Sequence, residues 1–298
     1  MILGRVTQAT IFRQLTSSAQ QLQAQLARAQ AEISSQKKLL DPSDDPAGAA
    51  QANRLRAEQS SLQALDTGIG FGTAVVGAED GALDQAGNLL TRAQEIATQQ
   101  SSGLTTTESR QEASDEVAQI ERAMLTLANT QVAGRYVFGG LATGTQPFAN
   151  LDDPGFDPAT AYSGPTTAFT LPIGTGQTVE LTTPGDQVFA STLTALDNLR
   201  TTLAAGNAPT ASVDELSTAA DTLRAERATV GGRVTRLQDR DTQIGRLTDT
   251  ATSQLSAVQD VDLTTAISQL VQLQTALQAT LASGSTLQQS ILDYLPTP

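Results

Sequence analysis

Small and apolar residues recur three and four positions apart near both ends of the chain, which is the spacing of a helix that packs along another helix. The large members of the two sets are Leu15, Leu22, Leu26 and Ile33, then Leu263, Ile267, Leu270, Leu277 and Leu281. Because such a stripe is stable only when buried, we expect long helices over residues 7–38 and 251–292 that use these side chains as an assembly interface. A helix pair within one chain and a contact between subunits fit the pattern equally well.

The two ends carry opposite charge. Residues 1–40 hold five basic side chains against Glu32, whereas residues 247–298 hold four Asp and no Lys or Arg. Surface ion pairs contribute under about 1 kcal/mol each, so we expect packing to dominate affinity and charge to help choose orientation.

A proline-rich segment follows the first predicted helix, Asp41-Pro42-Ser43-Asp44-Asp45-Pro46. Asp44 or Asp45 is suited to cap a second helix, with Pro46 in its first turn. The segment does not fit a calcium-binding loop, because Pro46 and Ala52 stand where such a loop requires Gly and Glu.

The second helix is expected to reach about Gln100, with a weak or bent stretch at Gly68, Gly70 and Gly72. Another helix start lies at Thr105–Glu108, and helix resumes near Ser191. Between them the composition changes, because residues 136–189 contain seven of the ten aromatic side chains. Their alternation, Phe169-x-Leu171-x-Ile173 and Val179-x-Leu181 around a glycine turn, predicts a β-hairpin with Pro172 on an edge strand.

These patterns predict a mainly α fold: a long antiparallel helical coiled-coil bundle built from both chain ends, with a small β-rich domain inserted at the middle of the chain. We expect three domains. Residues 1–40 and 247–298 form the terminal coiled coil, residues 41–135 and 191–246 form a helical bundle, and residues 136–190 form the β-rich surface domain.

Composition argues against an enzyme. The 298 residues include no His and no Cys, which removes the imidazole base, the thiol nucleophile and the usual zinc ligands. We therefore predict no catalytic residue, no cofactor and no metal site. One exception stays open as an alternative, a carboxylate-dependent hydrolase using Asp152, Asp153 or Asp157 of the insertion, although turn chemistry explains the same residues.

Charge and hydropathy limit the classes of partner that the chain can bind. A net charge of −13 without a basic patch argues against nucleic acid. The uncharged run between Asp262 and Asp293 is too rich in Gln, Thr and Ser to span a bilayer, so we expect no membrane contact. The N-terminus has no apolar core or cleavage site typical of a signal peptide, so any export would leave it uncut.

Three stretches resemble the flagellin superfamily, and within it the bacterial hook-filament junction proteins. They are Ile33–Lys38 leading into Asp41–Ala47, then Asn129–Gly140, and finally Gln289–Leu295. Flagellins proper typically have Asn-Ser-Ala, an acidic pair and Ala-Ala-Gly after the first helix, and favour Asn-x-x-Pro-Gln near the C-terminus. This chain has Asp41–Ala47 at the first place and Gln289-Ser290 at the second. Both differences from flagellins favour the junction family. Gln36 departs from that family, where many members have Gly.

The resemblance implies terminal helices in an inner tube that lines an export channel, the next helices in an outer tube, and the insertion as a surface knob. It also implies an extracellular structural adaptor of the flagellum, exported unfolded through the type III apparatus. The implied partners are other copies of the chain, flagellin, a hook-side junction protein and an export chaperone. A flagellin, which forms the filament itself, is the alternative.

Overall fold

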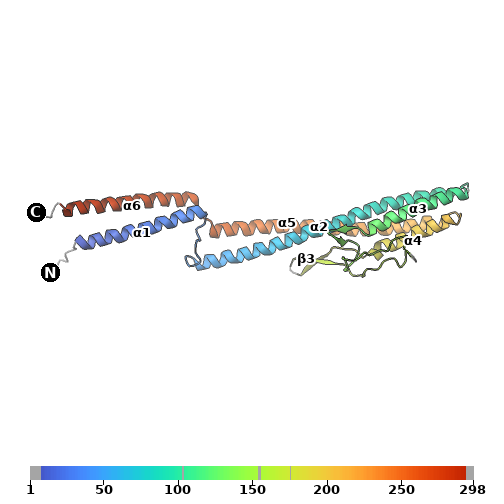
Figure 1. Cartoon of the computed structure of the whole chain (residues 1–298), viewed down its shortest axis with the longest axis horizontal. Helices are drawn as coiled ribbons and strands as arrows, with labels where there is room; N and C mark the ends of the chain where they lie inside the picture. Colours follow the sequence, from blue (N-terminus) through green and yellow to red (C-terminus); the bar gives the residue numbers. More distant parts are fainter. Residues whose placement is uncertain (1–7, 103, 154–155, 175, 293–298) are drawn as a thin grey trace. The chain divides into compact units, whose positions relative to one another are not determined.

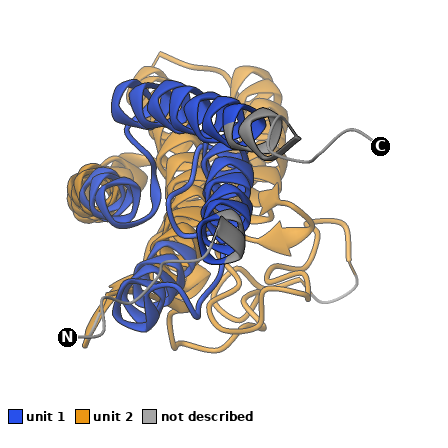
Figure 2. Ribbon diagram, turned by 90° about the vertical axis from the view of Figure 1, so that its left-hand side faces the viewer, with its two compact units in different colours: residues 1–60, 248–298 blue, residues 61–247 orange. Residues whose placement is uncertain are grey.

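The computed structural model describes residues 8–102, 104–153, 156–174 and 176–292. The described part forms two compact units (Figure 2). Unit 1 contains the residues up to 60 and from 248 onward, and unit 2 contains residues 61–247. Residues 293–295, the end of the C-terminal stretch that carries the resemblance, lie outside the described residues.

The described residues are mainly helical, with two small antiparallel strand pairs, which confirms the predicted fold class (Figure 1). The helices are α1 (Gln8–Ser35), α2 (Pro46–Gln100), α3 (Thr107–Ala128), α4 (Gly185–Ala204), α5 (Thr210–Gln259) and α6 (Leu263–Leu292). The strands are β1 (Gln131–Val132), β2 (Arg135–Tyr136), β3 (Thr170–Gly174) and β4 (Gln177–Glu180).

Helix starts follow the capping residues of the sequence. Pro46 is the first residue of α2, as predicted, and Gly48 N donates to Asp45 Oδ1 at 2.9 Å. At α3 the cap is Thr106, whose hydroxyl accepts from Ser109 N at 3.2 Å. In both cases a short polar side chain satisfies an amide that the first helical turn leaves without a backbone partner.

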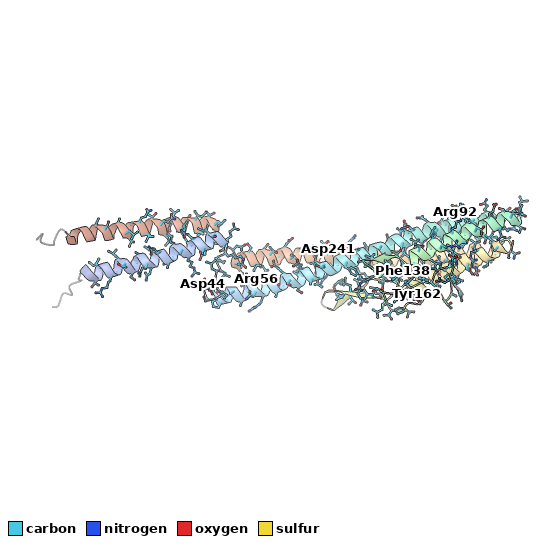
Figure 3. The ribbon with its side chains drawn as sticks, viewed as in Figure 1. Asp44, Arg56, Arg92, Phe138, Tyr162 and Asp241 are labelled. Atoms are coloured by element: carbon cyan, nitrogen blue, oxygen red, sulfur yellow. The ribbon has the colours of Figure 1, made fainter. Side chains whose placement is uncertain are left out.

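Unit 2 has a single core to which its helices and the inserted segment both contribute. Leu83 of α2, Met124 of α3, Leu196 of α4 and Leu237 of α5 are all completely buried in it. Phe138 and Phe148 of the insertion meet Phe189 of α4 edge to face, with ring centroids 4.8 and 5.9 Å apart. The aromatic segment therefore does not build a separate core. Figure 3 labels Phe138 and Tyr162 of this inserted segment.

The predicted hairpin is confirmed as β3 paired with β4. Ile173 and Val179 are buried, and Pro172 lies opposite Thr178 in a two-stranded sheet where both strands are edges. A second hairpin, β1 with β2, was not predicted. Its two turn residues, Ala133 and Gly134, have φ of 49° and 74°, as a type I′ turn requires.

Helix α2 continues unbroken from Pro46 to Gln100, as predicted, so the glycines at positions 68, 70 and 72 do not interrupt it, and one of them serves close packing. A Cβ at Gly72 would lie 3.0 Å from Leu181 and 3.1 Å from Leu171. Gly72 thus lets the β3–β4 segment approach the helix backbone, which sequence alone does not distinguish from a flexible glycine.

Candidate assembly surface on the terminal helices

Helices α1 and α6 pack along each other in unit 1, and Figure 1 shows them side by side. On α1 the predicted residues Leu15, Leu22, Leu26 and Ile33 are all half-buried, and Ala29 between them is buried. They follow the four-and-three spacing of a helix-packing seam. Within the chain, the predicted apolar residues of α1 therefore pack in the contact between α1 and α6.

On α6 the buried and half-buried side follows a different register from the predicted one. Its members are Ala266, Leu270, Leu273 and Leu277, of which only Leu270 and Leu277 belong to the predicted set. Leu273 and Ala266 were missed because α6 is apolar over an arc wider than one seam, so its sequence fits two registers. The steady four-and-three spacing of this second register places it on one face of the helix.

The other three predicted residues of α6 are exposed. Leu263, Ile267 and Leu281 expose 40%, 50% and 55% of their surface, and Val271 beside them exposes 54%. At about 100° per residue these four side chains fall on one face of the helix, next to the seam. We call them the α6 stripe. A row of large apolar side chains that the chain itself leaves uncovered is a candidate contact surface.

A shallow groove with a volume of about 430 Å³ also lies between α1 and α6. It is lined by Gln25, Arg28, Ala29 and Glu32 from α1 and by Gln269, Gln272, Leu273 and Ala276 from α6. Its amide side chains can exchange hydrogen bonds with another helix laid along it. The pair thus offers a second surface with the shape and chemistry for helix packing.

The chain breaks between α5 and α6 where a single helix over 251–292 was predicted, so that prediction is wrong at residues 260–262. Asp262 caps α6: its Oδ1 accepts from Thr264 N at 2.9 Å and its Oδ2 from the Thr265 hydroxyl at 2.8 Å. The Thr265 hydroxyl, with the amides beside it, lowers the pKa of Asp262. Asp262, which the sequence analysis counted among the acidic residues near the C-terminus, therefore caps the start of a helix.

The loop after α1 is joined to the loop before α6. Lys38 N donates to Gln259 O at 2.9 Å, and Val261 N donates to Gln36 O at 3.1 Å. The Lys38 ammonium also donates to Ala257 O at 2.8 Å. The bases of the two terminal helices are therefore held together by main-chain contacts as well as by packing.

Each acid of the Asp41–Pro46 segment has a separate structural role. Asp41 Oδ1 accepts from Ser43 N at 3.0 Å and from the Ser43 hydroxyl at 2.9 Å, and these bonds lower the pKa of Asp41. Asp44 pairs with Arg28 of α1 at 2.9 Å, and Asp45 caps α2. Figure 3 labels Asp44 close to the start of α2. The segment thus fixes the turn between α1 and α2.

Gln36, the position that departs from the junction family, has a φ of 59° immediately after α1. This left-handed conformation commonly ends a helix and is most easily adopted by Gly. The structure thereby explains why glycine suits the position and why glutamine is strained in it.

The carboxylates weighed for catalysis are engaged in local structure. Asp152 pairs with Arg122 at 3.1 Å, while Asp153 Oδ2 accepts from Asn150 N and Asp157 Oδ1 from Ala159 N. Among the described residues no group of three or more His, Cys, Asp or Glu side chains could hold a metal ion. Within the same residues no helix is both long and apolar enough to cross a membrane.

Two carboxylates that sequence reasoning did not single out are buried in unit 2. Glu79 of α2 and Glu121 of α3 both have fully buried side chains, and burial raises the pKa of each to about 7. Arg200 of α4 pairs with Glu121 at 3.0 Å, and Arg233 of α5 lies 3.6 Å from Glu79. Nothing in the sequence distinguishes these two Glu residues from those of a solvated helix face.

Comparison with known proteins agrees with this architecture. Residues 7–143 match the family model of the bacterial flagellin N-terminal helical region. Flagellar hook-associated protein 3 of Escherichia coli K12 is 25% identical over 287 residues, which cover 86% of this chain and 88% of that protein. The protein of the same name from Salmonella typhimurium is 28% identical over 63% of this chain and 57% of its own length. These matches confirm the resemblance to the flagellin superfamily and its junction proteins.

Solved structures show the same fold. A putative flagellar hook-associated protein from Vibrio parahaemolyticus aligns with a TM-score of 0.64 and 16% identity over 73% of this chain and 100% of its own. FlgL from Bacillus cereus aligns with a TM-score of 0.59 and 18% identity, covering 68% of this chain and 99% of its own.

Proposed function

We infer that this flagellin-superfamily chain, similar to flagellar hook-associated protein 3 along most of its length, is a structural adaptor of the bacterial flagellum. It joins hook-side junction subunits to the flagellin filament by helical packing. The observation that carries this conclusion is the match to the Escherichia coli protein over 86% of this chain and 88% of that one.

The proposed assembly interface consists of the nine predicted residues of the terminal helices. Their exposure suggests a division of labour. The half-buried residues of α1, with Leu270 and Leu277, hold the helix pair together, and Leu263, Ile267 and Leu281 of the α6 stripe contact neighbouring subunits. Burying an exposed Leu or Ile side chain fully contributes about 1.5–3 kcal/mol, so a stripe of this size is a substantial contact.

The proposed partners are other copies of this chain, flagellin and a hook-side junction protein. We also propose that an export chaperone holds a terminal segment before assembly, and that the chain leaves the cell unfolded through the type III apparatus without a cleaved signal. Terminal helices that cannot bury their apolar surface alone support this, because such segments gain order on binding. That the chain has no enzyme activity, binds no cofactor or nucleic acid and makes no membrane contact stays a prediction.

The predicted three-domain division is kept as a description of roles in the assembly. Residues 1–40 and 247–298 would form the inner tube, residues 41–135 and 191–246 the outer tube, and residues 136–190 the surface knob. A flagellin is not favoured as the alternative, because both relatives described above are named as hook-associated proteins. A hydrolase in the insertion is not favoured either, because its three candidate carboxylates are held in turns and an ion pair.

Seeded assembly followed by electron microscopy tests the adaptor function. Purified chain is added to isolated hook ends carrying the hook-side junction protein, and flagellin is added afterwards. An adaptor adds only a short terminal zone, from which flagellin then grows. Unlimited growth of the chain by itself would identify a flagellin instead, and failure to add at all would refute the assembly function.

A pair of matched variants tests the interface. Leu281→Asp places a charge on the exposed α6 stripe and should abolish incorporation without changing the helix content of the free chain, because Leu281 is 55% exposed there. Ala279→Asp adds the same charge to an exposed position roughly opposite Leu281 on α6, and should leave incorporation intact. Equal incorporation by both variants would exclude the stripe from the interface.

A further inference from the structure

The strongest unexplained feature of unit 2 is a buried ionic cluster that joins the inserted segment to two helices. The Glu79 side chain of α2 is fully buried, and the Arg233 side chain of α5 is 5% exposed. Between them lies Thr183, three residues after β4: its amide donates to Glu79 Oε1 at 3.1 Å and its hydroxyl accepts from Arg233 at 2.8 Å. Thr183 is therefore held from both sides.

Arg233 is shared unequally by two carboxylates. It donates to Glu180 of β4 at 3.1 Å, and the Glu180 side chain is 57% exposed. It lies 3.6 Å from Glu79, beyond hydrogen-bond range, and Glu79 Oε2 is buried without any hydrogen-bond partner. The guanidinium charge is thus already balanced by Glu180, whereas an ionised Glu79 would keep a buried oxygen without a donor.

We propose that Glu79 and Arg233 form a proton-controlled latch, tight when Glu79 is protonated, which fastens the inserted segment to α2 and α5 through Thr183. Protonation leaves every hydrogen bond of the cluster in place, since Oε1 still accepts from Thr183 and Arg233 still donates to Glu180 and Thr183. Ionisation adds a buried charge that Arg233 compensates only partly, which weakens the attachment.

The other charged groups around Glu79 favour the same direction. Glu226 of α5 raises the pKa of Glu79 further, while Arg233 and the bonds to Thr183 lower it without offsetting burial. Asp80, the next residue of α2, is held by Arg227 of α5 at 3.0 Å. With the folded pKa at about 7 and the ordinary value at 4.5, the folded state binds the proton more tightly. Attachment therefore weakens as pH rises from about 5 to about 7 and stays constant above.

Amide hydrogen exchange on the full chain measures this attachment directly. After correction for intrinsic exchange, protection of the Thr183 and Leu181 amides should fall on the order of a hundredfold between pH 5 and pH 7 and then level off, following the difference between the two pKa values. In Glu79→Gln this pH dependence should vanish. Glu121→Gln is the matched control, a buried neutral substitution elsewhere in unit 2 that should keep it.

Identical pH dependence in wild type and Glu79→Gln would overturn the proposal. Should Glu79→Gln fail to fold, the side-chain carboxyl carbon of Glu79, followed by NMR in the wild-type chain, decides by itself. A titration midpoint near pH 7 supports the latch and one near 4.5 overturns it. In Arg233→Met the midpoint should move to higher pH, because the guanidinium lowers the pKa of Glu79.

Discussion

Gly140 closes one of the stretches that resemble the flagellin superfamily, and the structure predicts a large cost for any side chain there. Its φ is 57°, and a Cβ on it would lie 2.9 Å from the carbonyl oxygen of Thr167 and closer still to that of Pro165. Both neighbours are backbone atoms, which cannot rotate away. Its own carbonyl accepts from the Thr182 hydroxyl at 3.3 Å, so a backbone shift would also disturb that bond.

Gly140→Ala should therefore destabilise unit 2 by about 2–4 kcal/mol. A positive φ costs Ala about 1 kcal/mol relative to Gly, and forcing a methyl group against fixed atoms costs about 1–3 kcal/mol. For a unit of this size the sum lowers Tm on the order of 5–10 °C. Thermal unfolding followed by near-UV circular dichroism is the assay, because Tyr136 and Tyr162 lie in unit 2.

Gly144→Ala is the control, four residues along the same loop. A Cβ there meets nothing within 4 Å, so its Tm should stay within about 2 °C of wild type. Equal destabilisation by the two variants would refute the steric argument.

Two further predictions follow from strained and buried groups. Gln36→Gly should raise the stability of unit 1 by about 1 kcal/mol, because it relieves the positive φ at the end of α1; urea unfolding measures this, and an unchanged or lower midpoint would contradict it. The stability of unit 2 should fall as pH rises between about 5 and 7, since Glu121 like Glu79 has a folded pKa of about 7, above its ordinary 4.5. Glu121→Gln should reduce that slope in calorimetry, and a slope equal to that of wild type would show that Glu121 is ionised in the folded chain.

Elements specified by local chemistry could be predicted from the sequence. Asp45 with Pro46 starts α2, and the alternation of Ile173 and Val179 with polar residues gives the β3–β4 hairpin. Each depends on residues close together in the chain, whose backbone preferences tertiary contacts did not override.

Features that depend on distant partners could not be predicted. Gly72 has the same local pattern whether α2 bends or Leu181 packs on it. Asp262 is a different case, because its capping bonds reach Thr264 and Thr265, only two and three residues away, and this local signal was missed when Asp262 was counted with the acidic tail. The side of α6 that packs against α1 was predicted only in part, because the apolar arc of this helix is wider than one packing seam and the sequence does not reveal which part of it meets α1.

The terminal helix α6 has one further property that bears on where such a protein can work. From Leu263 to Leu292 it contains no Asp, Glu, Lys or Arg. Dissolved salt screens interactions between charges and leaves the burial of apolar side chains largely unaffected at moderate concentration. A contact made by the α6 stripe should therefore hold equally well in dilute and in saline surroundings, so a joint built on it would tolerate changes in the ionic strength of the medium around it.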